Sequence, residues 1–470
     1  MGAAAVSVAV VSVAGPGSVG GRFVRVGTSL ALVALVYAAA AHGGFYSNEL
    51  EFTVLVVAAG LAISRWRVGL TRRDLNAPVL AVIGLGLWYL VAGAFAHDLT
   101  STVPALLLLG ALAATVLIVL RADATERRWL LTGLIGVGVL VAAIGWIGVA
   151  WRVSPYALED GGLWRAASTI TYANAAGALL AALALLTLGA FVVEGAPPLD
   201  AKVYRVAAYL LVVGLLASAS RAALLGFAAG LAVLIVSTRG RVLVRSGAIF
   251  GGAVLAMAGL APSMLASNTP RPWLACAALV LGAAIAIAPR RGFAVATAVA
   301  IACLAVPATR HATVHALQSL RAQRVTASSP DRSHELRAAL DLAHDHPIIG
   351  VGPGHVDLTW TITKPEPTTM HIAYAHDEYL QVLDESGVIG LGILVIGFAV
   401  VALSVWRARR NIDAGIFAGC LAALVALALH SSMDFLWHIP LVPLTGAVLI
   451  GAVLADAGPP PGLDPTREIT

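Results

Sequence analysis

The chain has 470 residues, of which 59% are hydrophobic and 12% charged; its formal net charge is +5 and its mean hydropathy is +0.88. This composition excludes a water-soluble globular protein, because no aqueous fold could hide so much apolar surface. The glycines in GVGPG lack the Lys-Ser/Thr pair of a nucleotide loop, so cytosolic ATP coupling is not supported. We expect no nucleic-acid partner.

Apolar runs follow one another along the chain, and each run is continuous rather than alternating. A bilayer core needs roughly 20 apolar residues per helix, and continuous runs favour helices over a β-barrel. We therefore predict an all-α polytopic membrane protein with about 14 spans, within a range of about 12 to 14. The predicted spans are residues 25–42, 45–64, 77–95, 102–120, 129–151, 173–193, 203–219, 222–238, 246–263, 273–289, 292–308, 386–406, 412–430 and 440–456.

Basic residues in short loops predict the orientation, because Lys and Arg in such loops stay in the cytoplasm. They follow the even-numbered spans, which places both termini inside. All 12 histidines fall in the predicted outer loops or at their edges, in agreement with this register. The basic residues that set the register are Arg65, Arg67, Arg72, Arg73, Arg121, Arg127, Arg128, Lys202, Arg205, Arg239, Arg241, Arg245, Arg290, Arg291, Arg407, Arg409 and Arg410.

The predicted organisation has five parts. Residues 1–24 and 457–470 are expected to be cytoplasmic tails, and residues 25–308 and 386–456 to carry the membrane helices. No basic segment precedes the apolar residues near the N-terminus, so we expect no cleaved signal peptide there. The three cysteines lie within spans and are expected to be packing residues.

Residues 309–385 form the fifth part, a large polar loop predicted to lie outside the membrane. A start signal at 329–331 predicts a loop helix running to about His344, with Leu336, Leu340 and Leu342 among its apolar residues. The Gly/Pro-rich turn HPIIGVGPGH at 346–355 ends it. A second helix is expected from near Ala375, because His376, Leu380 and Leu383 recur at helical spacing. That spacing would put the imidazole of His376 on the packed face of the helix.

Two further positions are unusual for a membrane protein. Arg221 is a lone cation at the predicted outer boundary, where it either snorkels to the headgroups or clamps an anion such as a diphosphate. His430, Asp434 and His438 would share one face if their segment were helical. An interfacial hydrogen-bonded cluster is favoured there over a zinc site, and we expect no metal and no cofactor.

Four segments in this order resemble the O-antigen ligase and polymerase superfamily of bacterial membrane glycosyltransferases. They are SASRAALLGFAAG (217–230), DRSHELRAALDLAHDHPIIGVGPGH (331–355), AHDEYLQVLDESGVIG (375–390) and HSSMDFLWHIP (430–440). The similarity covers residues 217–456. The earlier half is similar only as a helix-rich region, apart from TYANAAGALLAA (171–182), which contains Asn174.

The resemblance implies transfer of a glycan from a polyprenyl (undecaprenyl) diphosphate carrier to an acceptor on the outer face of the cytoplasmic membrane. It implies catalytic roles for Arg221, for a second arginine in the loop, and for His376. Arg332 is assigned as the second arginine and Arg337 is the alternative, because the tryptophan that often follows this arginine is absent. The usual His-Asn pair of the family is His376-Asp377 here.

The chemistry of these side chains agrees with an inverting, metal-independent transfer. Fixed guanidinium groups can stabilise the charge on a leaving diphosphate, and His376 can act as general base with Asp377 or Glu378 orienting it. Membrane lipid surrounds the site. The further substrate-binding candidates are Arg337, Asp377, Glu378, Tyr379, His430, Asp434, His438 and Asn174.

Two questions stay open at this stage. The acceptor can be a glycan, a lipid or a protein, and the oligomeric state is unknown. The alternative function is a flippase for lipid-linked glycans or another membrane transporter, which should show inverted repeats and interrupted helices at the midplane. Neither feature is visible in the sequence.

Overall fold

The computed structural model describes residues 19–65, 74, 76–193, 198–288, 330–356, 374–410 and 412–455. The predicted span 292–308, the C-terminal tail, most of the N-terminal tail and much of the large loop lie outside the described residues.

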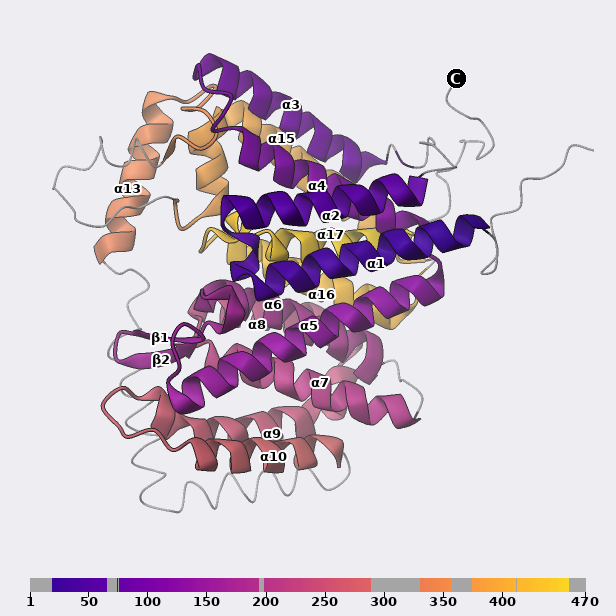
Figure 1. Ribbon diagram of the computed structural model, residues 1–470, viewed down its shortest axis with the longest axis vertical. Helices are drawn as coiled ribbons and strands as arrows, with labels where there is room; N and C mark the ends of the chain where they lie inside the picture. The colour runs from indigo at the N-terminus through magenta and orange to yellow at the C-terminus, as the bar shows by residue number, and fades with distance from the viewer. Residues whose placement is uncertain are drawn as a thin grey trace, which may run out of the picture.

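The described chain is built almost entirely of helices that lie side by side (Figure 1), with one short β-hairpin. The elements are α1 (Val19–Ala40), η1 (His42–Gly44), α2 (Ser47–Arg65), α3 (Ala77–Phe95), α4 (Val103–Arg121), α5 (Ala124–Trp151), β1 (Ala157–Asp160), β2 (Leu163–Ala166), η2 (Ser168–Ile170), α6 (Ala173–Thr187), η3 (Leu188–Val193), α7 (Pro198–Ala217), α8 (Arg221–Ser237), α9 (Arg241–Met264), α10 (Pro272–Ile287), α13 (Pro330–Asp345), α15 (Glu378–Ala408), α16 (Ala414–Ser431), η4 (Leu436–His438) and α17 (Leu441–Leu454).

The helices coincide with the predicted spans wherever the structure describes the chain. Each predicted span from 25–42 to 273–289, and from 386–406 to 440–456, falls on a helix. In the described residues, 8 helices are long and apolar enough to cross a bilayer, and shorter apolar helices accompany them. The chain is therefore an all-α, multi-pass membrane protein. The total of about 14 spans stays a prediction.

The core of the bundle is the segment Ala173–Val193, formed by α6 and η3. Every residue of this segment is buried inside the protein, and the segment packs against α7, α8 and α16. Small residues permit this burial: a Cβ at Gly189 would lie 2.6 Å from the backbone of Gly419 in α16. Close approach of backbones at small residues is typical of helices packed within a membrane.

Basic side chains gather where α2 and α4 end and where α5 begins. Asp74 pairs with Arg65 and Arg121 at N···O distances of 2.6 and 2.8 Å. Arg25 of α1 lies 3.6 Å from Glu126 in the first turn of α5. The chain segments that the charge register places in the cytoplasm thus share one end of the bundle, which we call the basic end.

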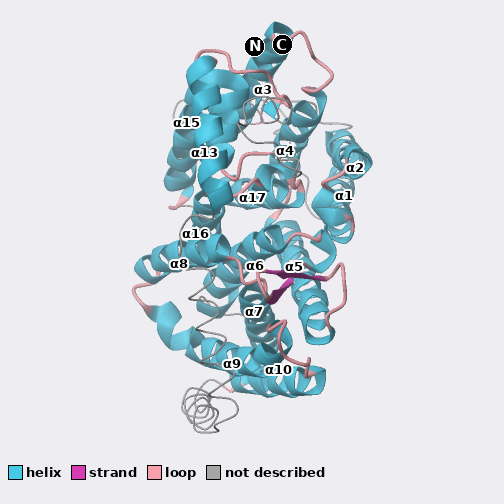
Figure 2. Ribbon diagram, turned by 90° about the vertical axis from the view of Figure 1, so that its left-hand side faces the viewer, coloured by secondary structure: helices cyan, strands magenta, loops and turns pink. Residues whose placement is uncertain are grey.

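The β-hairpin and α13 both lie at the opposite end, apart from each other, on the left in Figure 1 and toward the viewer in Figure 2. β1 and β2 are antiparallel, with Ala157 opposite Ala166 and Asp160 opposite Leu163. The hairpin follows the fifth predicted span, and α13 belongs to the large loop. Both were predicted to lie outside the membrane, and we call this end the hairpin end.

α15 consists of two helical parts that meet at a break. Gly387 has φ 65° and ψ −172°, a conformation open essentially only to glycine. The turn at 346–355 fits against this break: Val351 and Gly352 donate backbone hydrogen bonds to the carbonyls of Asp384 and Glu385, at 2.9 and 3.0 Å. The sequence predicted a loop helix from near Ala375 and a separate span from 386; the structure has a first helical part from Glu378 and a second part after the break at Gly387.

Replacing Gly387 with alanine should lower the thermal midpoint of the detergent-solubilised protein, because a Cβ there would overlap the carbonyl of Ile348 and the φ value would be strained. We expect the free energy of unfolding to fall by about 2 kcal/mol or more. Gly392→Ala is the matched control, since a Cβ at Gly392 meets nothing within 4 Å. Equal midpoints for the two variants, measured by differential scanning fluorimetry, would contradict the prediction.

Candidate functional site

His376 lies at the hairpin end in the turn before α15. Its Nδ1 atom lies 2.9 Å from Oε2 of Glu335 in α13, and its ring meets that of Phe435 edge to face at 5.4 Å. The imidazole is 28% exposed and the Glu335 side chain 9%. His376 therefore lies where α13, the start of α15 and the connection between α16 and α17 come together.

The prediction that His376 lies on a helix face is wrong, because α15 begins only after it. Asp377 is the N-cap residue: its carboxylate accepts hydrogen bonds from the backbone N–H groups of Tyr379 and Leu380, at 2.9 and 3.1 Å. An extended backbone at Asp377, with φ −159°, excludes the preceding residue from the helix. Burial raises the pKa of the Asp377 carboxyl, although these two N–H groups oppose the shift.

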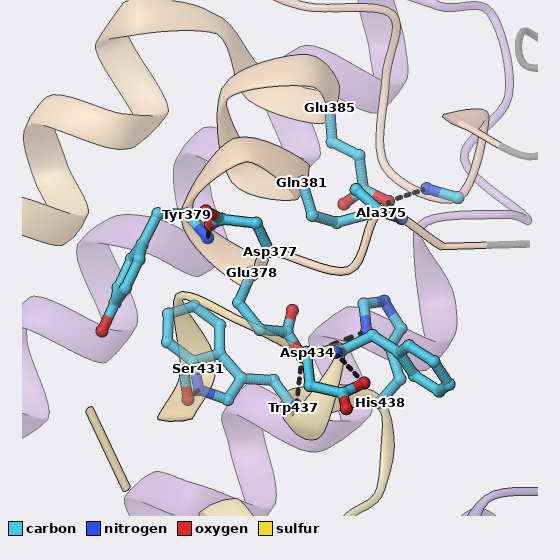
Figure 3. Close-up of polar contacts among 12 residues, drawn as sticks. Ala375, Asp377, Glu378, Tyr379, Gln381, Glu385, Ser431, Asp434, Trp437 and His438 are labelled. Carbon is cyan, nitrogen blue, oxygen red and sulfur yellow. Dashed lines mark hydrogen bonds and ion pairs between the residues drawn. The ribbon is translucent and has the colours of Figure 1, made fainter. Parts of the chain in front are cut away.

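The orienting partner expected for His376 was Asp377 or Glu378, and the structure places both elsewhere. Asp377 caps the helix, and the buried carboxylate of Glu378 points toward the connection between α16 and α17 (Figure 3). Glu378 accepts a hydrogen bond from the backbone N–H of Trp437, and its Oε1 lies 3.5 Å from Nδ1 of His438. Glu335 is the partner that sequence reasoning missed, because it is distant in sequence and carries no local signal.

The hydroxyl group of Tyr379 is engaged in a hydrogen bond within the protein. Its OH donates a 2.7 Å hydrogen bond to the carbonyl of Ala428 in α16, and its ring meets Trp437 edge to face at 5.6 Å. The side chain thus joins the first turn of α15 to α16. Substrate binding by Tyr379 stays a prediction.

The imidazole of His438 is held close to carboxylates. Burial alone would lower its pKa, but the charges of Glu378 and Glu385 and the contact with Glu378 outweigh burial, so the pKa of His438 is raised. The protonated imidazole therefore contributes stability below the unfolded value of about 6.5, and the contribution is lost as the pH rises through the higher folded value.

The thermal midpoint of the wild-type protein should accordingly fall more between about pH 6 and about pH 9 than that of His438→Gln. His344→Gln is the control, because the side chain of His344 is 89% exposed. Thermal unfolding at several pH values measures the difference. If the thermal midpoint changed equally with pH in the wild type and in His438→Gln, the raised pKa of His438 would be refuted.

Asn174 bridges two charged side chains. Its Oδ1 accepts a 2.6 Å hydrogen bond from Nη2 of Arg165 in β2, and its Nδ2 donates to Oδ2 of Asp434. Asp434, which is fully buried, also accepts from the hydroxyl of Tyr172 at 2.6 Å. The bridge compensates the charge of Asp434 and joins the hairpin to α6 and to the connection between α16 and α17.

Arg165 is a second residue that sequence reasoning missed. Its Nε donates a 3.0 Å hydrogen bond to the carbonyl of Ser218, and its Nη1 lies 2.6 Å from the carboxylate of Asp160. Ser218 begins the bend before α8. The signal that singled out Arg221, a cation in a loop predicted to be outside, was equally present at Arg165.

Arg221 is the first residue of α8 and is exposed. The bend that precedes it is fixed locally: Ala219 has φ 49°, and the Ser220 side chain caps the helix by accepting from the N–H of Ala223 at 3.2 Å. Arg221 therefore stands at the positively polarised end of a helix dipole, where an anion is favoured.

A continuous series of contacts joins the bend before Arg221 to His376. Ser218 is bonded to Arg165, and Arg165 to Asn174, which in turn bonds to Asp434. Asp434 is followed by Phe435, whose ring contacts His376. The structure thus links the surroundings of two predicted catalytic residues through three hydrogen bonds and one aromatic contact.

The other predicted site residues are placed as follows. Arg332 lies in α13, with its side chain outside the described part; Arg337 is exposed on the same helix. His430 is buried at the end of α16. His430, Asp434 and His438 do not share one helical face, because the condition of a continuous helix is not met: α16 ends at Ser431. The described residues contain no group of three or more His, Cys, Asp or Glu side chains arranged to hold a metal ion.

The pair of His376 and Glu335 can supply acid-base chemistry, and Arg221 can supply a cation for an anionic ligand. A carboxylate that accepts a hydrogen bond from Nδ1 of a histidine orients the ring and leaves a lone pair on Nε2. An arginine at a helix N-terminus can hold phosphate oxygens.

Comparison with known proteins identifies part of the chain. Residues 263–395 match the family model described as O-antigen ligase, and this match confirms the resemblance to the O-antigen ligase and polymerase superfamily. The matched segment includes α13, the turn at 346–355 and His376. No curated protein matches the chain. The family and the apolar helices together support a membrane glycosyltransferase-like function.

Proposed function

We propose that this protein, which carries an O-antigen ligase domain, is a membrane glycosyltransferase that moves a glycan from a polyprenyl (undecaprenyl) diphosphate donor to an acceptor outside the cytoplasmic membrane. The pair formed by His376 and Glu335 carries the proposal. Both residues lie in the matched segment, and their 2.9 Å contact is the geometry of an oriented general base.

The proposed reaction begins with deprotonation of the acceptor. With an ionised Glu335 as partner, Nδ1 of His376 carries the hydrogen, and Nε2 takes the proton of the acceptor hydroxyl or amine. The acceptor atom then bonds to the anomeric carbon as the bond between that carbon and the diphosphate oxygen breaks. The electron pair of that bond leaves with the diphosphate. Attack opposite the leaving group inverts the anomeric centre.

Arg221 stabilises the negative charge of the leaving group. Negative charge accumulates on the diphosphate as the bond breaks, so a fixed guanidinium stabilises the transition state more than the bound donor. Its position at the start of α8 supports this role, because the helix dipole adds to the field. Arg332, or Arg337 in its place, is the proposed second cation. No step in this mechanism requires a metal.

We assign the hairpin end to the outer face of the membrane and the basic end to the cytoplasm. The assignment follows from the gathering of arginines around Asp74 and Glu126, because positive loops stay inside. A flipped, lipid-linked donor would then meet His376 and Arg221 on the side where it is presented.

Cysteine labelling tests the orientation. In a chain whose three native cysteines are replaced by alanine, Glu159→Cys in the exposed hairpin should react with a membrane-impermeant maleimide in intact spheroplasts. Thr125→Cys at the exposed start of α5 should react only after permeabilisation. The reverse pattern would overturn the assignment.

Reconstitution tests the function. Proteoliposomes containing the purified protein and a radiolabelled polyprenyl-diphosphate glycan should release polyprenyl diphosphate and transfer the label to acceptor glycan, lipid or protein from the same cells. Movement of the donor between leaflets without release of diphosphate would replace the transferase by the flippase alternative. The chemical nature of the labelled product separates a ligase from a polymerase.

A further inference from the structure

Aromatic rings form a continuous row from the candidate site to the connection between α1 and α2. Phe435, which contacts His376, stacks on Tyr374 with ring centroids 5.5 Å apart. Tyr374 meets Phe45 at 6.2 Å, and Phe45 meets Tyr46 at 5.4 Å. We call Phe435, Tyr374, Phe45 and Tyr46 the aromatic row.

The outer part of the aromatic row is held by a rigid turn. His42, Gly43 and Gly44 have φ values of 43°, 74° and 81°, a run of left-handed residues that reverses the chain tightly after α1. The turn lies directly on the segment after η4: a Cβ at Gly43 would overlap the side chain of Ile439, and one at Gly44 would lie 3.3 Å from Pro440. The turn that carries Phe45 and Tyr46 and the segment that carries Phe435 are thus held against each other.

The row combines exposed rings with polar groups. Tyr46 is 52% exposed and Phe45 37%, so part of each residue is open to a ligand. Beside them, Nδ1 of His42 lies 2.8 Å from Oε1 of Glu49. Exposed apolar surface rimmed by polar groups is typical of a binding site.

We propose that the aromatic row is a sugar-binding subsite for the acceptor glycan. The proposal rests on the proposed function, because His376, which would deprotonate the acceptor, lies at the inner end of the row. The C–H faces of sugar rings pack on aromatic rings, and sugar hydroxyls bond to imidazole groups such as that of His42, whose side chain is 43% exposed and is held by the buried Glu49. Since Tyr46 is several rings from His376, it contacts a sugar beyond the one that reacts.

A membrane-interface role for the exposed rings predicts different behaviour. Aromatic residues at an interface anchor a helix to the headgroups and do so independently of any glycan. The row instead continues inward, where Tyr374 lies 3.9 Å from the ring of His438 within the protein. Trp273, which is 78% exposed at the start of α10, provides the comparison because it lies at the same end of the bundle.

Direct binding tests the subsite without requiring catalysis. The probes are fluorescently tagged oligosaccharides of about four to eight sugars, released by mild acid from the surface polysaccharide of the producing cells, and the monosaccharides from the same material. Affinities are measured by fluorescence anisotropy on the full chain in detergent. Tyr46→Ala and Phe45→Ala should each weaken binding of the oligosaccharides about 10-fold, while binding of the monosaccharides by Tyr46→Ala stays at the wild-type level.

The controls separate this proposal from the proposed function. His376→Ala should lose most of the glycan transfer but weaken oligosaccharide binding less than Tyr46→Ala does, because the aromatic row remains intact. Unchanged binding in Tyr46→Ala and Phe45→Ala, or an equal loss in Trp273→Ala, would overturn the subsite. Wild-type transfer by His376→Ala together with weakened binding in Tyr46→Ala would retain the subsite and refute the catalytic proposal.

Discussion

Replacing His376 with alanine should reduce glycan transfer by about 10³-fold, because the acceptor would lose its general base. The protein should still reach normal abundance, since the imidazole is partly exposed and its removal leaves only a small gap. The rate of polyprenyl diphosphate release from a radiolabelled donor in proteoliposomes measures the effect. His344→Ala, with an exposed imidazole in the neighbouring helix α13, should transfer at the wild-type rate.

Glu335→Gln sharpens this prediction. The amide can still contact Nδ1 but carries no charge, so we expect the rate of polyprenyl diphosphate release to fall about 10-fold. Transfer at the wild-type rate by His376→Ala of normal abundance would refute the role of His376.

Replacing Arg221 with alanine should reduce transfer by about 10² to 10³-fold, mainly through the turnover rate rather than through donor affinity. The reason is that its charge acts most strongly on the diphosphate as the bond to the sugar breaks. Arg221→Lys should recover part of the rate, since lysine keeps the charge but lacks the planar fork. Initial rates at several donor concentrations separate an effect on the turnover rate from an effect on donor affinity.

Arg239→Ala provides the matched control for Arg221. Arg239 is also exposed and lies just beyond the other end of α8, away from the hairpin end. Its loss should leave transfer unchanged. Equal effects of the two substitutions would mean that net charge near the membrane matters, and that Arg221 has no specific contact with the donor.

The helices could be predicted from the sequence because hydrophobicity over a bilayer thickness is a local property. The spans around α3, α4 and α6 agree with the structure within a few residues for this reason. The start of α15 differs by three residues, because the helix was predicted from near Ala375 and begins at Glu378. Its position is decided by the Asp377 cap and by the break at Gly387, which are details of single side chains and backbone angles.

The candidate site was predictable only where a residue was locally unusual. Arg221 and His376 stood out as polar residues beside apolar runs. Glu335 did not, because an acidic residue in a polar loop helix is ordinary, and only folding brings it to His376. Arg165 is an intermediate case: its position in an outer loop was visible, but its bonds to Asn174 and Ser218 depend on how the hairpin packs.

The turn at 346–355 and the break in α15 form one interlocked unit. Gly350 and Gly387 each approach the backbone of the opposite segment so closely that neither segment tolerates a side chain there. Two stretches that are separate in the sequence must therefore change together during divergence. A chimaera that takes its outer loop from a related protein should fold only if it also takes residues 384–388 from the same donor, so the exchangeable module extends into the membrane helix.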